Sequence, residues 1–266
     1  MGKFDNYLLV SDFDGTLLNS YKKISDKNKE AISYFVSNGG VFCGASGRTQ
    51  YNIAPFTDGL PITVPWILYN GAVIYDFNTE EFVHMQVIDK EPIKNTIEKL
   101  LIIYPTLCVQ IYTKKALFLI NKHGKRDYHI ESENQTFIYC DIDKIAGEWI
   151  KVLLHDDYEV LNKINSSFNT EEFNSTYNRI FSTSTYLELI NINVSKATAM
   201  VKLKNMIDTK NRKIIAIGDF FNDYDMIRNA DIGAAPENAP EEIKRVAKII
   251  TTSNDRHAIY DLIHKI

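Results

Sequence analysis

Four aspartates stand at two places in the chain, each place directly after a short apolar run. Asp12 and Asp14 follow the run YLLVS, and Asp219 and Asp223 follow the run KIIAIG. Carboxylates that converge repel one another, so some must bind protons unless a cation lies between them. Oxygen ligands alone favour a hard divalent cation, magnesium rather than zinc. These residues therefore predict an Mg²⁺ site.

The first pair alone is open to other interpretations. A solvated turn of acids and glycine at the end of a strand would look the same, and a metal-binding D-x-D of the glycosyltransferase kind is a third choice. The D-x-D normally follows a nucleotide-binding region, for which the segment before Asp12 is too short. An EF-hand is excluded, because its loop needs glycine and glutamate where this chain has Leu17 and Lys23.

Short apolar runs with polar ends are the elements that must position the aspartates. Besides the two runs above, they include GVFCGA before Ser46, WILY before Asn70, and runs at 231–235 and 248–252. Such runs are typical of strands that are covered on both faces. Helical patterns at 25–38 and 241–248 alternate with them, so we predict an α/β fold: a Rossmann-like parallel sheet core with helices on both faces. Ligands bind at the carboxyl ends of such strands, where the aspartates stand.

The middle of the chain has a different texture. It is rich in tyrosine and phenylalanine, with alternating segments such as VQIY and ALFLI and helical patterns at 90–103 and 158–168. We expect residues 86–186 to form an inserted α+β cap domain. Residues 1–85 and 187–266 would then form the catalytic core, with hinges at 83–87 and 186–190.

Composition limits the classes of partner. The 30 basic and 34 acidic residues give a net charge of −4, which leaves no basic excess for nucleic acid. No apolar stretch approaches the length of a membrane span, and no signal peptide is evident. Three scattered cysteines suit a reduced, cytoplasmic protein. Nothing in the sequence specifies an oligomeric state.

Four features taken in chain order carry a resemblance to a known family. They are the segments DFDGTL and ASGRT, then Lys196, then the segment GDFFND. In this order they resemble the haloacid dehalogenase-like (HAD) phosphatase superfamily. The NGA that begins at Asn70 and the later segment ADIGAAPENA resemble its Cof-type branch. The resemblance implies a hydrolase of phosphoric monoesters.

The resemblance also implies roles for the acids. Asp12 would be the nucleophile and Asp14 the general acid and base. The magnesium ion would be held by Asp12, the backbone carbonyl of Asp14, and Asp219. Asp223 would be a further ligand or a supporting acid.

A second set of residues would bind the phosphoryl group. Ser46 would donate a hydrogen bond to it, with Gly47 and Arg48 beside it. Lys196 would neutralise charge between nucleophile and phosphate, and Asn222 would support the site. Taken singly, such a lysine more often begins a solvated helix and such a serine caps a strand end, so the assignment depends on the joint order of the motifs.

Elementary chemistry agrees with these roles. A phosphomonoester is doubly charged, so a carboxylate cannot approach it without cations, which magnesium and Lys196 would supply. Attack by Asp12 would give an aspartyl phosphate and split the hydrolysis into two easier steps. Asp14 would protonate the leaving oxygen and later take a proton from water.

The position of the insert, after the second motif, resembles the cap of HAD subclass IIB. A cap that closes over the site excludes water and suits a small phosphorylated metabolite such as a sugar phosphate. Two departures from the family pattern stand out: Ala197 where glycine is usual, and the segment from Asp255 to Ala258 where the family commonly has Asp-Gly-Val. The second puts a loop near the site in doubt.

The sequence therefore predicts a magnesium-dependent phosphatase of small phosphomonoesters. A phosphotransferase or phosphomutase would use the same residues. A receiver-like signalling module also phosphorylates an aspartate, but it is about half as long and lacks an acid two residues after its nucleophile. A non-catalytic sensor of phosphorylated ligands is disfavoured, because no motif residue is missing.

Overall fold

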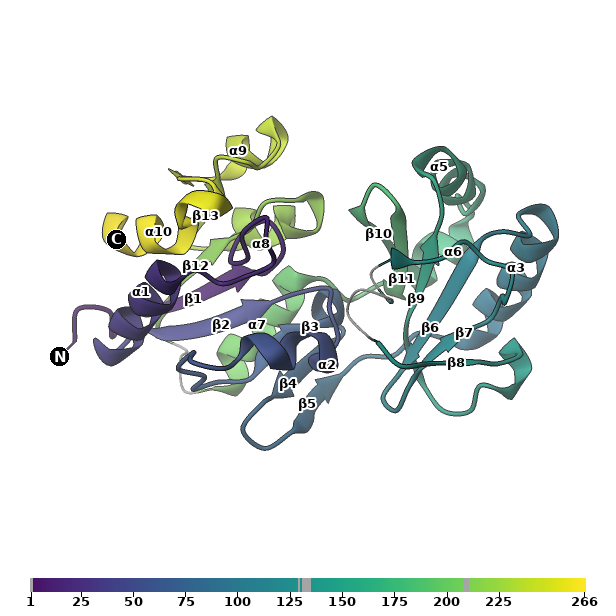
Figure 1. The fold of residues 1–266 in the computed structure, drawn as a ribbon, viewed down its shortest axis with the longest axis horizontal. Helices are drawn as coiled ribbons and strands as arrows, with labels where there is room; N and C mark the ends of the chain where they lie inside the picture. The colour runs from purple at the N-terminus through teal and green to yellow at the C-terminus, as the bar shows by residue number, and fades with distance from the viewer. Residues whose placement is uncertain (1, 129, 131–134, 208–210) are drawn as a thin grey trace. The chain divides into compact units, whose positions relative to one another are not determined.

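The computed structural model describes residues 2–128, 130, 135–207 and 211–266. The chain divides into two compact units. The core unit comprises Met1–His84 and Ser195–Ile266, and the insert unit comprises Met85–Val194. In Figure 1 the core unit therefore takes its colours from both ends of the bar, and the insert unit is largely teal.

The core unit is built on an eight-stranded sheet with the order β14-β13-β12-β1-β2-β3-β4-β5. The strands from β14 to β3 run parallel, and β4 pairs antiparallel with β3. Their bounds are β1 (Tyr7–Asp12), β2 (Val41–Ala45), β3 (Trp66–Leu68), β4 (Val73–Asp76), β5 (Glu81–Met85), β12 (Lys213–Ile217), β13 (Ile232–Pro236) and β14 (Ile249–Thr251). Because β12, β1 and β2 are parallel neighbours, the residues that follow them gather at one edge of the sheet.

Helices connect the strands of the core unit. They are α1 (Asp26–Ser37), α2 (Gln50–Ile53), α7 (Lys196–Met206), α8 (Tyr224–Asn229), α9 (Glu241–Val246) and α10 (Ala258–Lys265). The step from β1 to β2 goes one way along the sheet and the step from β12 to β13 goes the other. Right-handed connections therefore put α1 and α8 on opposite faces. Helix α10 packs against α1, and α7 packs against α8. The predicted α/β class is confirmed.

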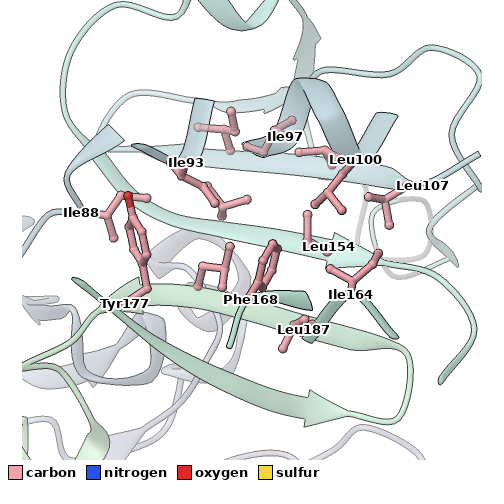
Figure 2. Packing of buried hydrophobic residues seen from close by; sticks show 14 of the residues in the cluster. Ile88, Ile93, Ile97, Leu100, Leu107, Leu154, Ile164, Phe168, Tyr177 and Leu187 are labelled. Carbon is pink, nitrogen blue, oxygen red and sulfur yellow. The ribbon is translucent and has the colours of Figure 1, made fainter. Parts of the chain in front are cut away.

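The insert unit has a six-stranded mixed sheet with the order β10-β11-β9-β6-β7-β8. Its strands are β6 (Cys108–Thr113), β7 (Leu117–Leu119), β8 (Phe137–Tyr139), β9 (Trp149–His155), β10 (Tyr177–Thr183) and β11 (Tyr186–Asn191), and its helices are α3 (Lys90–Ile103), α5 (Tyr158–Ser167) and α6 (Glu171–Thr176). Figure 2 shows their core: Ile93 and Ile97 of α3 and Ile164 of α5 pack on Leu154 of β9 and Leu187 of β11. The insert unit thus has a hydrophobic core of its own.

The chain crosses between the two units twice, and the second border differs from the prediction. The first lies between His84 and Met85, close to the expected 85/86. The second lies between Val194 and Ser195, later than the expected 186/187. The reason is β11, which pairs with β9 and β10 and so extends the sheet of the insert unit. None of the helices in the described part of the chain is both long and apolar enough to cross a membrane.

Candidate active site

Two of the predicted acids, and the serine predicted to bind phosphate, lie at the ends of neighbouring strands. Asp12 is the last residue of β1, Ser46 directly follows β2, and Asp219 follows β12 after one glycine. Lys196 is the first residue of α7, which is capped by Ser195: its hydroxyl accepts the backbone N–H of Thr198. The pairing of the parallel strands and the position of α7 thus bring together residues that are far apart in the sequence.

Lys196 lies at the centre of this arrangement. Its Nζ donates to Oδ1 of Asp12 at 2.5 Å and to Oδ1 of Asp223 at 2.6 Å. Its side chain has no exposed surface. Burial favours a neutral lysine, but the two carboxylates outweigh burial and raise the pKa of Lys196, so it stays charged.

Asp12, Asp219 and Asp223 form a tight acidic cluster. Each offers a carboxylate oxygen within 4.8 Å of the others. Burial, then the charge of Asp223, raises the pKa of Asp12 well above its ordinary value despite the Lys196 cation. The same two causes raise the pKa of Asp219 to about 7. The cluster thus carries more negative charge than Lys196 neutralises.

This donor set fits a hard divalent cation. It consists of oxygen atoms only, and the raised pKa values of Asp12 and Asp219 are the mark of carboxylates that lack a sufficient counter-charge. Asp223 is also held in place by other contacts: its Oδ2 accepts the backbone N–H of Asp219 and of Phe220. It therefore orients both Lys196 and the turn that carries Asp219.

A tight turn links the two ends of the chain at this cluster. Gly15 has a φ of +79°, and a side chain there would fall 2.3 Å from Oδ2 of Asp219. The next residue, Thr16, is fully buried and donates from its hydroxyl to Oδ1 of Asp219 at 3.0 Å. Glycine is therefore required at 15 both for its conformation and for the approach of Asp219.

Asp14 is not part of the cluster, because its carboxylate binds two cations instead. Arg48 donates from Nε to Oδ2 at 2.6 Å and from Nη2 to Oδ1 at 2.9 Å. Lys22 donates from Nζ to Oδ1 at 2.8 Å. Burial raises the pKa of Asp14, but the hydrogen bonds and charge of Arg48, followed by those of Lys22, outweigh it and hold the pKa well below its ordinary value. Asp14 is therefore ionised.

A chain of polar groups from β2, β3 and β12 borders the cluster. The hydroxyl of Ser46 accepts the backbone N–H of Arg48 at 3.1 Å, and the carbonyl of Ser46 accepts the N–H of Asn70 at 2.9 Å. Asn70 is fully buried, with a left-handed φ of 53°, and its Oδ1 accepts from Nδ2 of Asn222 at 3.1 Å. At Gly47 a side chain would crowd the Asn70 amide. The predicted Ser46, Gly47, Arg48 and Asn222 thus lie along one connected edge.

Sequence reasoning gave no role to four residues that contact this site: Thr16, Lys22, Asn70 and Asn238. Asn238 donates from Nδ2 to the carbonyl of Gly15 at 2.8 Å. Thr16, Asn70 and Asn238 lie inside the segments that carry the family resemblance, so position within a motif was the available signal. Lys22 lies outside every motif and has no such signal.

Known proteins resemble this chain over nearly its whole length. The model of the haloacid dehalogenase-like hydrolase family matches residues 9–263. The Bacillus subtilis protein 5-amino-6-(5-phospho-D-ribitylamino)uracil phosphatase YcsE is 28% identical over 256 residues, covering 94% of this chain and 91% of its own.

Solved structures also resemble this chain over nearly its whole length. A haloacid dehalogenase-like hydrolase from Bacteroides thetaiotaomicron has a TM-score of 0.83 and 26% identity, with 99% of both chains covered. The subclass IIB sugar phosphatase BT4131 shares the fold with a TM-score of 0.80 at 18% identity, over 97% of this chain and 98% of its own. These similarities span the core unit and the insert unit alike.

Proposed function

Because the chain belongs to the haloacid dehalogenase-like hydrolase family, and is a phosphatase of phosphomonoesters, we propose that its substrates are small phosphorylated metabolites. The proposed hydrolysis uses magnesium and proceeds through a phosphoaspartate on Asp12. The observation that carries the proposal is the buried Lys196, held between Asp12 and Asp223. A cation without exposed surface beside a carboxylate is costly to build for stability alone. It is useful where a carboxylate must approach a dianion.

Asp12 is the proposed nucleophile. One of its carboxylate oxygens forms a bond to phosphorus while the bond from phosphorus to the ester oxygen breaks. Lys196 already lies on Oδ1 of Asp12 and remains charged, so it offsets the repulsion between the carboxylate and the incoming phosphate. Water then attacks the phosphorus of the acyl phosphate and restores Asp12.

Asp12, Asp219 and Asp223 are the side chains that would hold Mg²⁺. When bound, the ion supplies Lewis-acid stabilisation of the phosphoryl oxygens. The chain's own contribution is the geometry of its donors: Thr16 fixes one oxygen of Asp219, and the backbone N–H groups of Asp219 and Phe220 fix one oxygen of Asp223.

Asp14 is the proposed general acid and base. Arg48 and Lys22 keep it ionised, as a base must be, but their charges also weaken its basicity toward the attacking water. To donate a proton to the leaving oxygen it must first lose part of this cationic support. A bound phosphate dianion would compete with Asp14 for both cations, so substrate binding itself would raise the pKa of Asp14.

The name of one relative supports a proposed substrate class. The name of the Bacillus subtilis relative specifies a phosphorylated ribityl chain, so sugar and polyol phosphates are the first candidates. The core unit would recognise the phosphoryl group that they share.

A release assay tests the proposal. Purified protein is incubated with Mg²⁺ and a panel of sugar, polyol, nucleotide and cofactor phosphates, and inorganic phosphate is measured. We expect release from sugar or polyol phosphates that stops in excess chelator and in Asp12→Asn. Transfer of the phosphoryl group to a second sugar without release would contradict hydrolysis and favour a phosphomutase. Unchanged release in Asp12→Asn would exclude Asp12 as the nucleophile.

A further inference from the structure

The segment that departs from the family pattern lies against the loop that follows the catalytic aspartates. This loop, residues 15–20, leaves Asp14 and turns back: the N–H of Leu18 donates to the carbonyl of Phe13 at 2.8 Å, and Leu18 forms a bridge with Asp14. The loop continues into a turn at 19–23 that carries Lys22, whose Nζ binds Asp14. The backbone of Asp14 and one of its cations therefore depend on this loop.

Two asparagines hold the start of the loop. Asn238, in the turn after β13, donates to the carbonyl of Gly15 at 2.8 Å. Its Oδ1 accepts the backbone N–H of Asn254, in the segment after β14, at 2.9 Å. Asn254 is itself buried and donates from Nδ2 to the carbonyl of Leu18 at 3.0 Å. These amides link β13 and β14 to the backbone on both sides of the turn after Asp14.

Asp255 holds the end of the loop. Its Oδ1 accepts the backbone N–H of Ser20 and its Oδ2 accepts the Ser20 hydroxyl, both at 2.7 Å. Two bonds from one carboxylate to one residue fix position and orientation together. Ser20 belongs to the turn in which Lys22 takes a left-handed φ of 56° and reaches Asp14. Turn strain of this kind persists only where neighbours enforce it.

The segment is also fixed at its far side. His257 has a left-handed φ of 66°, a conformation that glycine adopts at lower cost, and its Nδ1 lies 2.9 Å from the Ser25 hydroxyl that caps α1. Asn28 of α1 accepts the backbone N–H of Tyr260 at 3.0 Å. The departure from the family pattern thus keeps the segment docked, with a histidine contact at a strained position.

We propose that Asn238, Asn254 and Asp255 are positioning residues for Asp14, acting through the loop at 15–20. The proposal rests on the role of Asp14 as general acid and base. The three residues do not touch the phosphoryl group; they hold the backbone of Asp14 and the turn of Lys22 at the place from which Asp14 meets the leaving oxygen. Small errors in such placement cost large factors in rate.

Leaving-group dependence distinguishes positioning from a merely structural role. 4-Nitrophenyl phosphate barely needs a proton donor, whereas phenyl phosphate has nearly the same shape and needs one. We expect Asp255→Ala to lower kcat/KM for phenyl phosphate roughly tenfold more than kcat/KM for 4-nitrophenyl phosphate, because kcat/KM reports formation of the phosphoenzyme and not its hydrolysis, which is common to both substrates. Asp255→Asn keeps an oxygen that accepts the Ser20 N–H and gains an amide N–H that can donate to the Ser20 hydroxyl, so it should restore the ratio. Arg256→Ala, which alters the exposed neighbour that pairs with Glu237, should leave the ratio unchanged.

Two further variants, Ser20→Ala and Asp14→Asn, complete the test of the positioning role. Ser20→Ala changes an exposed residue and removes one of the two hydrogen bonds to Asp255. It therefore tests the same contact even if Asp255→Ala does not fold. Asp14→Asn is the reference for full loss of the donor. The reference result is a leaving-group bias in Asp14→Asn, that is, a larger loss of kcat/KM for phenyl phosphate than for 4-nitrophenyl phosphate. If Asp14→Asn shows this bias, equal losses on both substrates in folded Asp255→Ala and Ser20→Ala would overturn the positioning role. No loss in these two folded variants would overturn it as well. Absence of the bias in Asp14→Asn itself would overturn the role of Asp14 and the inference with it.

Discussion

Lys196, the first residue of α7, and Asp12, the last residue of β1, meet at 2.5 Å although they lie 184 positions apart in the sequence. The contact is out of solvent, with the lysine side chain wholly buried and the Asp12 side chain 8% exposed. A buried pair of this kind leaves a costly unpaired charge when one partner is removed. If Asp12 is the nucleophile as proposed, stability and catalysis depend on the same contact.

Replacing Lys196 by methionine tests this dependence. Lys196→Met leaves Asp12 and Asp223 buried without their cation, so we expect unfolding free energy to fall by about 3–5 kcal/mol. Turnover of 4-nitrophenyl phosphate should fall by about 10²–10³-fold or more, because a charge that stabilises the transition state is lost. Denaturant unfolding and steady-state kinetics measure both.

A matched control separates the two effects. Lys151 forms a comparably buried pair with Glu188 in the insert unit, at 2.9 Å. Lys151→Met should cost similar stability but much less turnover of the same activated substrate. Near-normal turnover in folded Lys196→Met would be incompatible with the proposed role of this cation.

Gly71 offers a steric test of how Lys196 is placed. Its φ is +103°, and a side chain there would fall 2.2 Å from the carbonyl oxygen of Ser195, directly before Lys196. Gly71→Ala should therefore lose both stability and activity. Gly147 has a similar φ of +85° but nothing within 4 Å of an added side chain. Gly147→Ala should lose only about 1 kcal/mol, from backbone strain alone. Equal effects of the two substitutions on activity would argue against a steric link to Lys196.

The acidic cluster predicts an unusual dependence of stability on pH. The folded-state pKa of Asp219 is about 7, above the ordinary value of 3.8 that applies to the unfolded chain. Between these values the folded state binds more protons, so the metal-free protein should lose stability as pH rises from about 4 through about 7. Mg²⁺ binds the ionised form, so its stabilising effect should grow over the same range.

Thermal unfolding measures this prediction directly. The increase in Tm on adding Mg²⁺ should be small at about pH 5 and larger at about pH 8, as expected for a metal site whose ligands must lose protons. Asp219→Asn removes one of the two carboxyl groups with a raised pKa and should weaken both trends, leaving the part that is due to Asp12. A magnesium-dependent rise in Tm that is as large at the acidic end as at the alkaline end would refute the assignment of Asp219.

The strands and the gathering of the acids were predictable because they depend on local signals. Apolar runs that end in acids mark strand ends, and parallel order brings Asp12 and Asp219 to one edge. Helix α3 was predicted with its observed bounds, 90–103, because its apolar residues keep helical spacing. Family resemblance, rather than spacing, selected Lys196, since a single lysine at a helix start carries little information.

The features that the sequence did not predict depend on contacts between distant segments. The bonds from Asn238 to Gly15 and from Asp255 to Ser20 join positions that no spacing rule relates. The second border of the units was placed too early, because only strand pairing shows that β11 belongs to the insert sheet. Lys22 reaches Asp14 through a strained turn that its own sequence does not predict.

The central claim is that the phosphoryl group is transferred to Asp12. The two acids of the segment DFD differ by one intervening residue, yet only Asp12 pairs with buried Lys196, while Asp14 pairs with Arg48 and Lys22. Asp14→Asn keeps the nucleophile, so it should still form a phosphoenzyme from an activated substrate and hydrolyse it slowly. Asp12→Asn should form none.

Rapid quench with labelled 4-nitrophenyl phosphate, followed by digestion and identification of the labelled peptide residue, is the most direct measurement. We predict label on Asp12 in the parent protein, accumulation of the same label in Asp14→Asn, and no label in Asp12→Asn. Label on Asp14 or on any other residue, or a burst that persists in Asp12→Asn, would contradict the account.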